Sequence, residues 1–403
     1  MSNRKLFKEA SFALSLTVFG GLVTGTIWAG LDQTLASLAG LIAIVPVIGQ
    51  MRGNISGIFT SRIGTGLHLG SIQPTLRKRS KEFNNTVLMN LSLSFITPIW
   101  VGFIVYLLHF IAGGKTTFLH FLFVSIIAGI VSAFIQIFLA LFIAFQIFKR
   151  GMDPDVLAYP LLSMIADVTT AVAILIGFTV DRSITEQLPW VVRFFLELVG
   201  IFSLISFLLI IFSRPIRSKL EFELFNLLGE SVPVVWSAVI IGGFVGIIMD
   251  GSIPYNGVIL VLPIYMAYTG SMGAIIGSKF TTAYYLGSLS SREGKLDTYL
   301  FTPLILLLIG LLLSTGLGLV GYFLSQVLGY GLPKPDLLSF VIICWATGLV
   351  TTVFSIFNAL VVGNITFQRG IDADNIIVPL TSTIGDLVAV VTIVIAINVL
   401  LLF

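Results

Sequence analysis

The chain has 403 residues, of which 57% are hydrophobic and only 10% are charged, and its mean hydropathy is +1.06. Soluble domains carry about 25% charged residues, so this composition excludes them and indicates a polytopic membrane protein. The net charge of +3 does not indicate nucleic-acid binding, because the basic residues lie in short loops between apolar segments.

Eleven apolar segments predict membrane-spanning helices, each of which needs about 20 residues. In chain order they are Phe12–Leu31, Leu35–Ser61, Val87–Ala112, Phe118–Phe148, Val156–Val180, Trp190–Phe212, Val232–Met249, Tyr255–Ser278, Tyr299–Leu328, Leu337–Phe367 and Ile376–Phe403. The expected fold class is therefore an all-α polytopic membrane protein with about 11 transmembrane helices.

The loops on the two sides of the membrane differ in charge. With the N-terminus inside, fifteen Lys and Arg residues fall in inner loops and three, Lys115, Arg182 and Lys334, fall in outer loops. Because cytoplasmic loops carry the excess of Lys and Arg, this predicts a cytoplasmic N-terminus and an external C-terminus. We expect a multi-pass protein of the plasma membrane.

Two segments of the chain share one sequence pattern. Eight of the 17 residues from Gly151 to Asp167 recur between Gly370 and Asp386, at a constant offset of 219 residues. A second block agrees at an offset of 217. Its matched positions include Pro46 and Pro263, Gly53 and Gly270, Ser61 and Ser278, and Arg62 and Lys279.

These matches predict two repeats. We expect a first five-helix repeat over residues 1–186, a linker transmembrane helix over 187–214 and a second five-helix repeat over 215–403. Five helices leave the chain on the opposite face of the membrane, so one extra crossing lets both repeats point the same way. Such repeats are related by an axis along the membrane normal. The chain is then an intramolecular pseudo-dimer that can act as a monomer.

Asp167 and Asp386 end the matched segments, each about halfway along an apolar run. An Asp at the centre of a spanning helix costs roughly 2.5–3.5 kcal/mol, and such residues face a bundle interior or a water-filled cavity. The pseudo-twofold axis would bring both carboxylates to one central path. Two facing carboxylates repel each other unless a cation lies between them, which predicts a cation pathway. The alternative is that neighbouring hydroxyls satisfy each carboxylate.

Ser163 and Ser382 lie four residues before these aspartates and therefore on the same helix face. They are expected either to line the path or to pack closely against a neighbouring helix, as small residues do in membranes.

Glycine-rich segments follow both prolines of the second block, at residues 49–57 and 269–277. They contain Gly53 with Asn54, and Gly270 with Ser271. We expect each segment to interrupt its helix and to expose carbonyls to a cavity. The alternative is close helix packing through glycine.

Paired acids begin the fifth helix of each repeat. They are Asp153 with Asp155, and Asp372 with Asp374. Carboxylates at a helix start cap its backbone and interact favourably with its dipole. The pattern fits capping, with or without a further role as a vestibule that attracts cations on the cytoplasmic side.

At these residues the chain resembles the MgtE-type magnesium transporter family, and more closely its duplicated branch that includes solute carrier family 41. Residues 53–70 resemble the Gly-Asn segment of that branch, and residues 370–386 resemble its Gly-x-Asp-Pro-Asp-Asn segment with the later Pro and Gly-Asp. The resemblance extends over both halves and so over nearly the whole chain.

The resemblance implies a five-helix unit paired around a central cation path, with Mg²⁺ as the transported substrate. The family's membrane Asp corresponds to Asp167 and Asp386, and its Gly-Asn corresponds to Gly53 and Asn54 and to Gly270 and Ser271. Because Ser271 replaces the Asn, unequal contributions of the two halves are expected. Mn²⁺ and Co²⁺ remain alternative substrates.

Two other functions compete with a magnesium channel or transporter. One is a divalent cation exchanger coupled to Na⁺ or H⁺ through the same carboxylates. The other is an intramembrane aspartyl protease, but the two aspartates lie in like contexts, and the segment 383–386 lacks the first Gly of that class's motif. The sequence holds no phosphate loop, HExxH motif or Ser-His-Asp set, so an enzyme is not expected.

Overall fold

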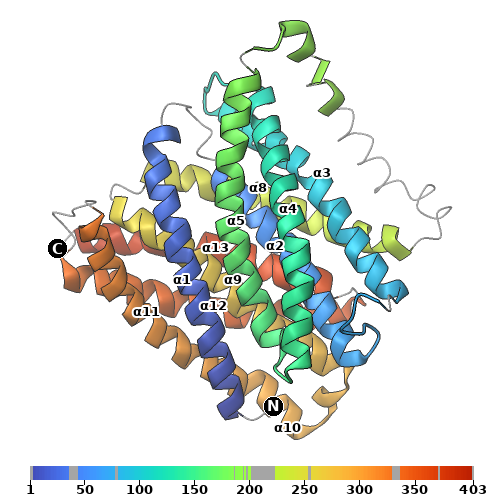
Figure 1. Ribbon diagram of the computed structural model, residues 1–403. Coiled ribbons are helices and arrows are strands. Elements are labelled where there is room, and N and C mark those ends of the chain that lie inside the picture. The colour runs from blue at the N-terminus through green and yellow to red at the C-terminus, as the bar shows by residue number, and fades with distance from the viewer. Residues whose placement is uncertain are drawn as a thin grey trace.

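The computed structural model describes residues 3–35, 44–77, 80–185, 187–193, 195–196, 198–200, 223–252, 256–328, 336–370 and 373–401. Within these ranges the chain is helical and has no strand. The long helices form one bundle (Figure 1). They are α1 (Asn3–Leu35), α2 (Ile44–Leu69), α3 (Lys81–Ile111), α4 (Phe118–Lys149), α5 (Pro154–Thr185), α8 (Glu223–Ser252), α9 (Asn256–Tyr285), α11 (Thr302–Val327), α12 (Leu337–Gln368) and α13 (Ala373–Leu401). Three short elements connect α9 to α11: η2 (Ser288–Ser290), α10 (Arg292–Leu296) and η3 (Asp297–Phe301).

The described helices confirm an all-α polytopic membrane protein. Nine of the described helices are long and apolar enough to cross a membrane. The remaining long helix, α2, coincides with a predicted span but does not reach the same hydropathy. The predicted linker helix Trp190–Phe212 lies outside the described residues from 201 onward.

The two matching helices α2 and α9 occupy the centre of the bundle. Helix α2 packs against α3, α4, α5, α8, α9 and α13, and α9 packs against α1, α5, α11, α12 and α13. Nearly every residue of α2 is buried, and so is the most apolar stretch of α9. Because α2 has no lipid-facing side, it can carry Gln50, Arg52 and Arg62 without exposing them to hydrocarbon.

Contacts between the halves are reciprocal. Helix α1 packs against α9 and α11 of the second half, and α8 packs against α2 and α3 of the first. The α4–α5 and α12–α13 pairs form the corresponding contacts within each half. Each half thus wraps its first helix around the other, which buries the central helices from both sides.

Gly151 and Gly370 begin the matched segments for a backbone reason. Their φ angles are +68° and +64°, in the left-handed region that glycine adopts without steric cost. Each ends a helix, and its N–H donates to the carbonyl three residues earlier, at Phe148 and Phe367 respectively. The chain can therefore reverse direction at once into α5 and α13.

The expectation of broken helices in the glycine-rich segments was wrong. Helix α2 continues through residues 49–57, and α9 continues through Pro263 and residues 269–277. Neighbouring helices on all sides hold the backbone helical, so no stretch of carbonyls is released to a cavity. The glycines instead leave space beside the helices, either for a cavity or for a neighbouring helix.

Candidate functional site

A cavity of about 40 Å³ lies between the two halves. It has room for a few water molecules, since each needs roughly 10–15 Å³. Its walls come from α1, α2, α5, α9 and α13, and they contain no Lys, Arg or His. The lining residues are Thr24, Pro46, Gly49, Gln50, Gly53, Tyr159, Ser163, Asp167, Thr170, Ala171, Ile174, Pro263, Met266, Ala267, Ser382 and Asp386.

Asp167 and Asp386 both line this cavity, one from each half. Ser163 and Ser382 line it as well, as expected for residues one helical turn away. The cavity therefore collects two carboxylates and two hydroxyls from matching places on α5 and α13. Its only formal charges are negative.

The two carboxylates differ in their support. Asp386 is 4% exposed, and its Oδ1 lies 3.2 Å from the Thr269 hydroxyl, a hydrogen-bond donor. Among the described residues, no side chain or backbone group donates to Asp167. Asp386 is therefore held in place, whereas Asp167 presents its oxygens to the cavity.

The two aspartates differ because the residue that holds Asp386 is not repeated in the first half. Thr269 corresponds to Arg52 at the offset of 217. Arg52 turns away from the cavity toward α3 and α4. Its Nε and Nη2 donate to Gln136 Oε1 at 3.3 and 3.2 Å, and its Nη1 donates to Ser94 Oγ at 3.1 Å. Gln136 is in turn within 3.3 Å of the Thr169 hydroxyl on α5. In the first half, Arg52 therefore connects α2 to α3 and α4, and Gln136 extends the network to α5. In the second half, the equivalent Thr269 instead holds the carboxylate of Asp386.

Of the predicted positions Gly53, Asn54, Gly270 and Ser271, one lines the cavity and the others lie in contacts between helices. An added Cβ on Gly53 meets no described atom within 4 Å, so this glycine keeps the cavity open. A Cβ on Gly270 would lie 2.8 Å from Ser382 Oγ, so Gly270 allows α9 and α13 to pack closely. Asn54 Nδ2 donates to Thr383 Oγ1 at 2.9 Å across the halves. Ser271 lies 3.5 Å from the Thr17 hydroxyl. Asn54, Gly270 and Ser271 are not among the lining residues.

Tyr159 and Gln50 line the cavity but were not singled out from the sequence. Tyr159 stands two helical turns before Asp167, yet its repeat equivalent is Val378, so the repeat comparison conceals it. Gln50 is buried, and neither atom of its amide has a partner of hydrogen-bond geometry among the described residues. An unsatisfied buried amide beside a polar cavity indicates a place for water or an ion.

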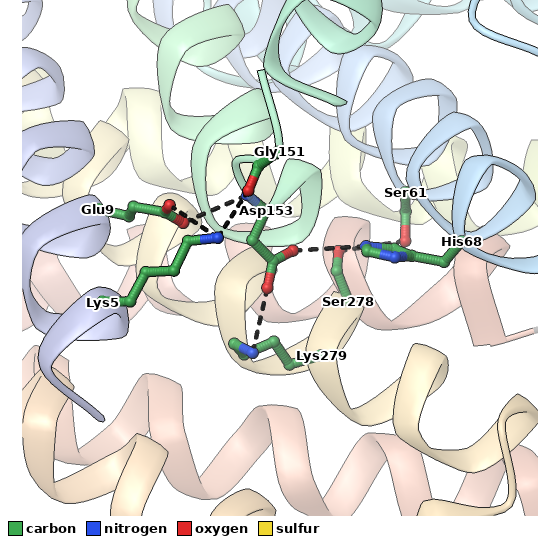
Figure 2. A network of polar contacts seen from close by, with 8 residues as sticks. All are labelled: Lys5, Glu9, Ser61, His68, Gly151, Asp153, Ser278 and Lys279. Carbon is green, nitrogen blue, oxygen red and sulfur yellow. Dashed lines mark hydrogen bonds and ion pairs between the residues drawn. The ribbon is translucent and has the colours of Figure 1, made fainter. Parts of the chain in front are cut away.

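Of the paired acids, Asp153 and Asp374 lie away from the cavity, at the end of the bundle where α1 and α5 begin and α4 ends (the basic end). Figure 2 shows Asp153 between both halves, with its Oδ2 3.3 Å from Lys279 Nζ of α9 and its Oδ1 3.5 Å from His68 Nε2 of α2. Its backbone N–H donates to Glu9 Oε2 at 3.2 Å. Lys5 in turn donates to the Gly151 carbonyl at 2.6 Å.

The second half forms a related contact. Asp374 accepts hydrogen bonds from Ser61 at 2.7 Å and Thr65 at 3.2 Å, both on α2. Arg62 donates to Asn375 at 3.2 Å, and Asn375 donates to Glu230 at 2.9 Å. The repeat-equivalent bases Arg62 and Lys279 thus each reach the start of the opposite half's fifth helix.

The described acids also take part in contacts between the halves. Asp153 and Asp374 each contact the opposite half, while the capping and vestibule roles remain predictions. The Asp155 side chain and the whole of Asp372 lie outside the described residues. The expectations for these two positions remain predictions.

No group of three or more His, Cys, Asp or Glu residues in the described part of the chain forms a metal cage. The central cavity instead combines two carboxylates with hydroxyl and amide oxygens. Mg²⁺ is commonly bound by one or two carboxylates while it keeps several waters. The donor set fits a partly hydrated ion in transit better than a tightly caged one.

A sequence model of the MgtE family, described as divalent cation transporter, matches residues 45–177 and 262–396, which is more than half of the chain. Solute carrier family 41 member 2 of Gallus gallus is 27% identical over 179 residues, covering 41% of this chain and 30% of the relative. The Homo sapiens protein of that name is 24% identical over 307 residues, covering 71% of this chain and 51% of its own length. The chain thus spans between about a third and a half of these curated relatives.

A likeness to a solved structure is much weaker. The crystal structure of MATE in complex with MaL6 aligns with 97% of this chain and 94% of its own, at 13% identity and a TM-score of 0.40. That score is too low to indicate a shared fold.

Proposed function

Because this chain belongs to the MgtE family of divalent cation transporters, we propose that it carries Mg²⁺ through the central cavity, with Asp167 and Asp386 as the binding carboxylates. One observation carries the proposal: a carboxylate from each half lines a single buried cavity that has no basic side chain. Two such charges in a bilayer are costly unless a cation accompanies them.

The cavity supports a hydrated ion rather than a bare one. Direct contacts would come from Asp167, which lacks a competing donor, while Asp386 held by Thr269 supplies a fixed second charge. The hydroxyls of Ser163 and Ser382 and the amide of Gln50 would bind the ion's remaining waters. Magnesium dehydrates reluctantly, so a site that keeps its waters lets the ion enter and leave.

We place the basic end in the cytoplasm of the plasma membrane, with the N-terminus inside and the C-terminus outside, because Lys and Arg concentrate there. Repeats over residues 1–186 and 215–403, joined by a linker helix over 187–214, would make one chain a complete pseudo-dimer. Two matches to the family model within one chain support this division.

We propose that the contacts of Asp153 with Lys279 and of Ser61 with Asp374 close the basic end to ions in this conformation. Release of ions into the cytoplasm then requires these contacts to break. Polar pairs connect the two halves at this end, and such pairs can separate and re-form. Apolar side chains of α1 and α8 also pack on the opposite half. Movement of the halves about the central helices is the step we assign to transport.

A coupled exchanger is the second candidate, favoured by the burial of Asp386. When the divalent ion leaves, two carboxylates remain in a cavity without a base, and a proton or Na⁺ would balance them. Uptake measured with and without an imposed Na⁺ or pH gradient separates the two mechanisms. A flux that is independent of both gradients would exclude the exchanger.

The proposal is tested by Mg²⁺ uptake into proteoliposomes with Asp167→Asn and Asp386→Asn. Each substitution preserves shape and removes one charge, so we expect uptake to fall at least ~tenfold, the effect of about 1.4 kcal/mol. Asp336→Asn, an exposed helix cap, is the matched control and should retain uptake. Wild-type rates in both cavity variants would contradict the proposal.

A further inference from the structure

A second recess lies on the outer surface of the first half, away from the ion cavity. It has a volume of about 860 Å³ and runs between α3 and α4 beneath the loop before α3. Its lining is apolar along its length and carries Arg77 and Lys149 at the basic end. The other lining residues are Pro74, Thr75, Leu76, Phe83, Val87, Leu91, Phe134, Ile137, Phe138, Leu139, Leu141, Phe142, Phe145 and Gln146.

Aromatic side chains on α4 form the floor of this groove. Phe134, Phe138 and Phe142 follow one another at four-residue spacing, and all are exposed. From Phe134 to Lys149 the helix rises about 22 Å at 1.5 Å per residue. Half of a bilayer's hydrocarbon core is about 15 Å. The groove is therefore long enough to receive an acyl chain from its mouth to past the membrane midplane.

The mouth of the groove is positively charged. Lys149 is the last residue of α4, and Arg77 lies in the loop before α3. No Asp or Glu is among the groove's lining residues. The sequence continues from Arg77 with Lys78 and Arg79, which adds to the charge of this loop although their placement is outside the described residues. Basic pockets between membrane helices on the cytoplasmic side suit anionic lipid headgroups.

We propose that this groove binds an anionic phospholipid of the cytoplasmic leaflet. Its phosphate would contact Arg77 and Lys149, and one acyl chain would lie along Phe142, Phe138 and Phe134. Guanidinium and ammonium groups form charge-assisted hydrogen bonds to phosphate. An apolar partner protein would not need the basic mouth, and a soluble anion would not need the apolar length.

The second half provides a matched control surface. At the offset of 219, Phe357 corresponds to Phe138, and the two are similarly exposed, at 66% and 71%. Lys149 corresponds to Gln368, so the equivalent end of α12 lacks that charge. Arg292 and Lys295 are exposed bases in the connection from α9 to α11 and do not line the groove. The basic and the apolar parts of the groove can therefore each be tested against a similar substitution outside it.

The test is a titration of the purified protein with palmitoyl-oleoyl phosphatidylglycerol, followed by native mass spectrometry. The paired substitution Arg77→Gln with Lys149→Gln should weaken binding about thirtyfold, the effect expected for two basic residues. The pair Arg292→Gln with Lys295→Gln should leave binding within twofold. Wild type should bind the zwitterionic phosphatidylcholine at least ~tenfold more weakly.

The apolar part of the site has its own variant. Phe138→Ala should weaken phosphatidylglycerol binding about fivefold or more through lost apolar contact, whereas Phe357→Ala should not. Size-exclusion elution at the wild-type volume establishes that each variant is folded. Equal binding by the Arg77/Lys149 variant and wild type would overturn the proposal. So would equal binding of the two lipids. A dimer of wild type in light scattering that becomes a monomer in Phe138→Ala would also overturn it, because a second copy of the chain would then cover the groove.

Discussion

The hydroxyl oxygens of Ser61 and Ser278 lie 3.3 Å apart, although 217 residues separate them in the chain. That separation is the offset at which the second block of the repeat matches. A residue touches its own equivalent only beside a twofold axis. The contact therefore supports an axis that passes between α2 and α9, with Asp153 and Lys279 bridging the halves beside it.

This contact predicts that a disulfide will lock the halves. In a Cys344→Ala background, which removes the chain's one cysteine, Ser61→Cys with Ser278→Cys should oxidise readily. The oxygens lie 3.3 Å apart, so a small shift of the two side chains would bring the sulfurs to the bond length of about 2.05 Å. Because the transport step that we propose separates the halves at this end, oxidation should stop Mg²⁺ uptake, and dithiothreitol should restore it. Undiminished uptake by the oxidised protein would refute this movement.

The ion pair between Lys279 and Asp153 predicts a second effect. Both side chains are mostly buried, at 15% and 14% exposed. We expect Lys279→Gln to favour opening of the basic end by about 1 kcal/mol, or roughly fivefold. The readout is the labelling rate of Ser278→Cys by a maleimide in the Cys344→Ala background. Lys295→Gln, an exposed lysine at the same end, is the control. Equal labelling rates would show that the pair does not hold this end closed.

A substitution at Gly53 should affect transport without lowering stability. An added Cβ meets no described atom, and Ala is about 1 kcal/mol better than Gly in a helix. Gly53→Ala should therefore keep or raise the melting temperature, while its methyl group enters the cavity and slows Mg²⁺ uptake. Gly57→Ala is the contrasting variant, since its Cβ would lie 2.5 Å from Val378 and 2.8 Å from Tyr159. It should lower the melting temperature. Faster uptake by Gly53→Ala would contradict this account of the cavity.

The Arg52 network predicts non-additive effects on stability. Gln136→Met leaves the buried guanidinium with Ser94 but without its amide partner, a loss of about 1–3 kcal/mol. Arg52→Met with Gln136→Met removes both groups and should melt at a higher temperature than Gln136→Met alone. Arg52→Lys should also destabilise, because an ammonium cannot reproduce the fork toward Gln136. Thermal unfolding in one detergent measures all three. A double variant that melts no higher than Gln136→Met would contradict a coupled network.

Much of the fold could be predicted from segment length and hydropathy. A helix exposed to lipid needs about 20 apolar residues to cross the bilayer. Ten of the eleven predicted spans coincide with long described helices, and the linker span Trp190–Phe212 lies mostly outside the described residues. Helix α2 is the informative exception. Its low hydropathy reflects complete burial among other helices, and hydropathy cannot separate that case from a segment that fails to span. Its continuity through glycines likewise depends on neighbours that no local pattern reveals.

The candidate site was predictable where the repeat duplicates it and obscure where it does not. Asp167 and Asp386 appear as a pair, and both line the cavity. Tyr159 corresponds to Val378 in the second repeat, so a comparison of the two repeats does not identify Tyr159 as a site residue. Arg62 and Lys279 match in sequence, but their partners in the opposite half depend on how the halves approach each other. Only the assembled bundle contains that information.

The most direct test of the central claim is a pair of density maps, recorded with Mg²⁺ and with a chelator. We predict an additional peak in the central cavity with Mg²⁺ present, within coordination or water-bridged distance of Asp167 and near Asp386. The peak should weaken in Asp167→Asn. A cavity that looks identical in both maps, in protein that transports Mg²⁺ at the wild-type rate, would contradict the assignment of these carboxylates to the ion path.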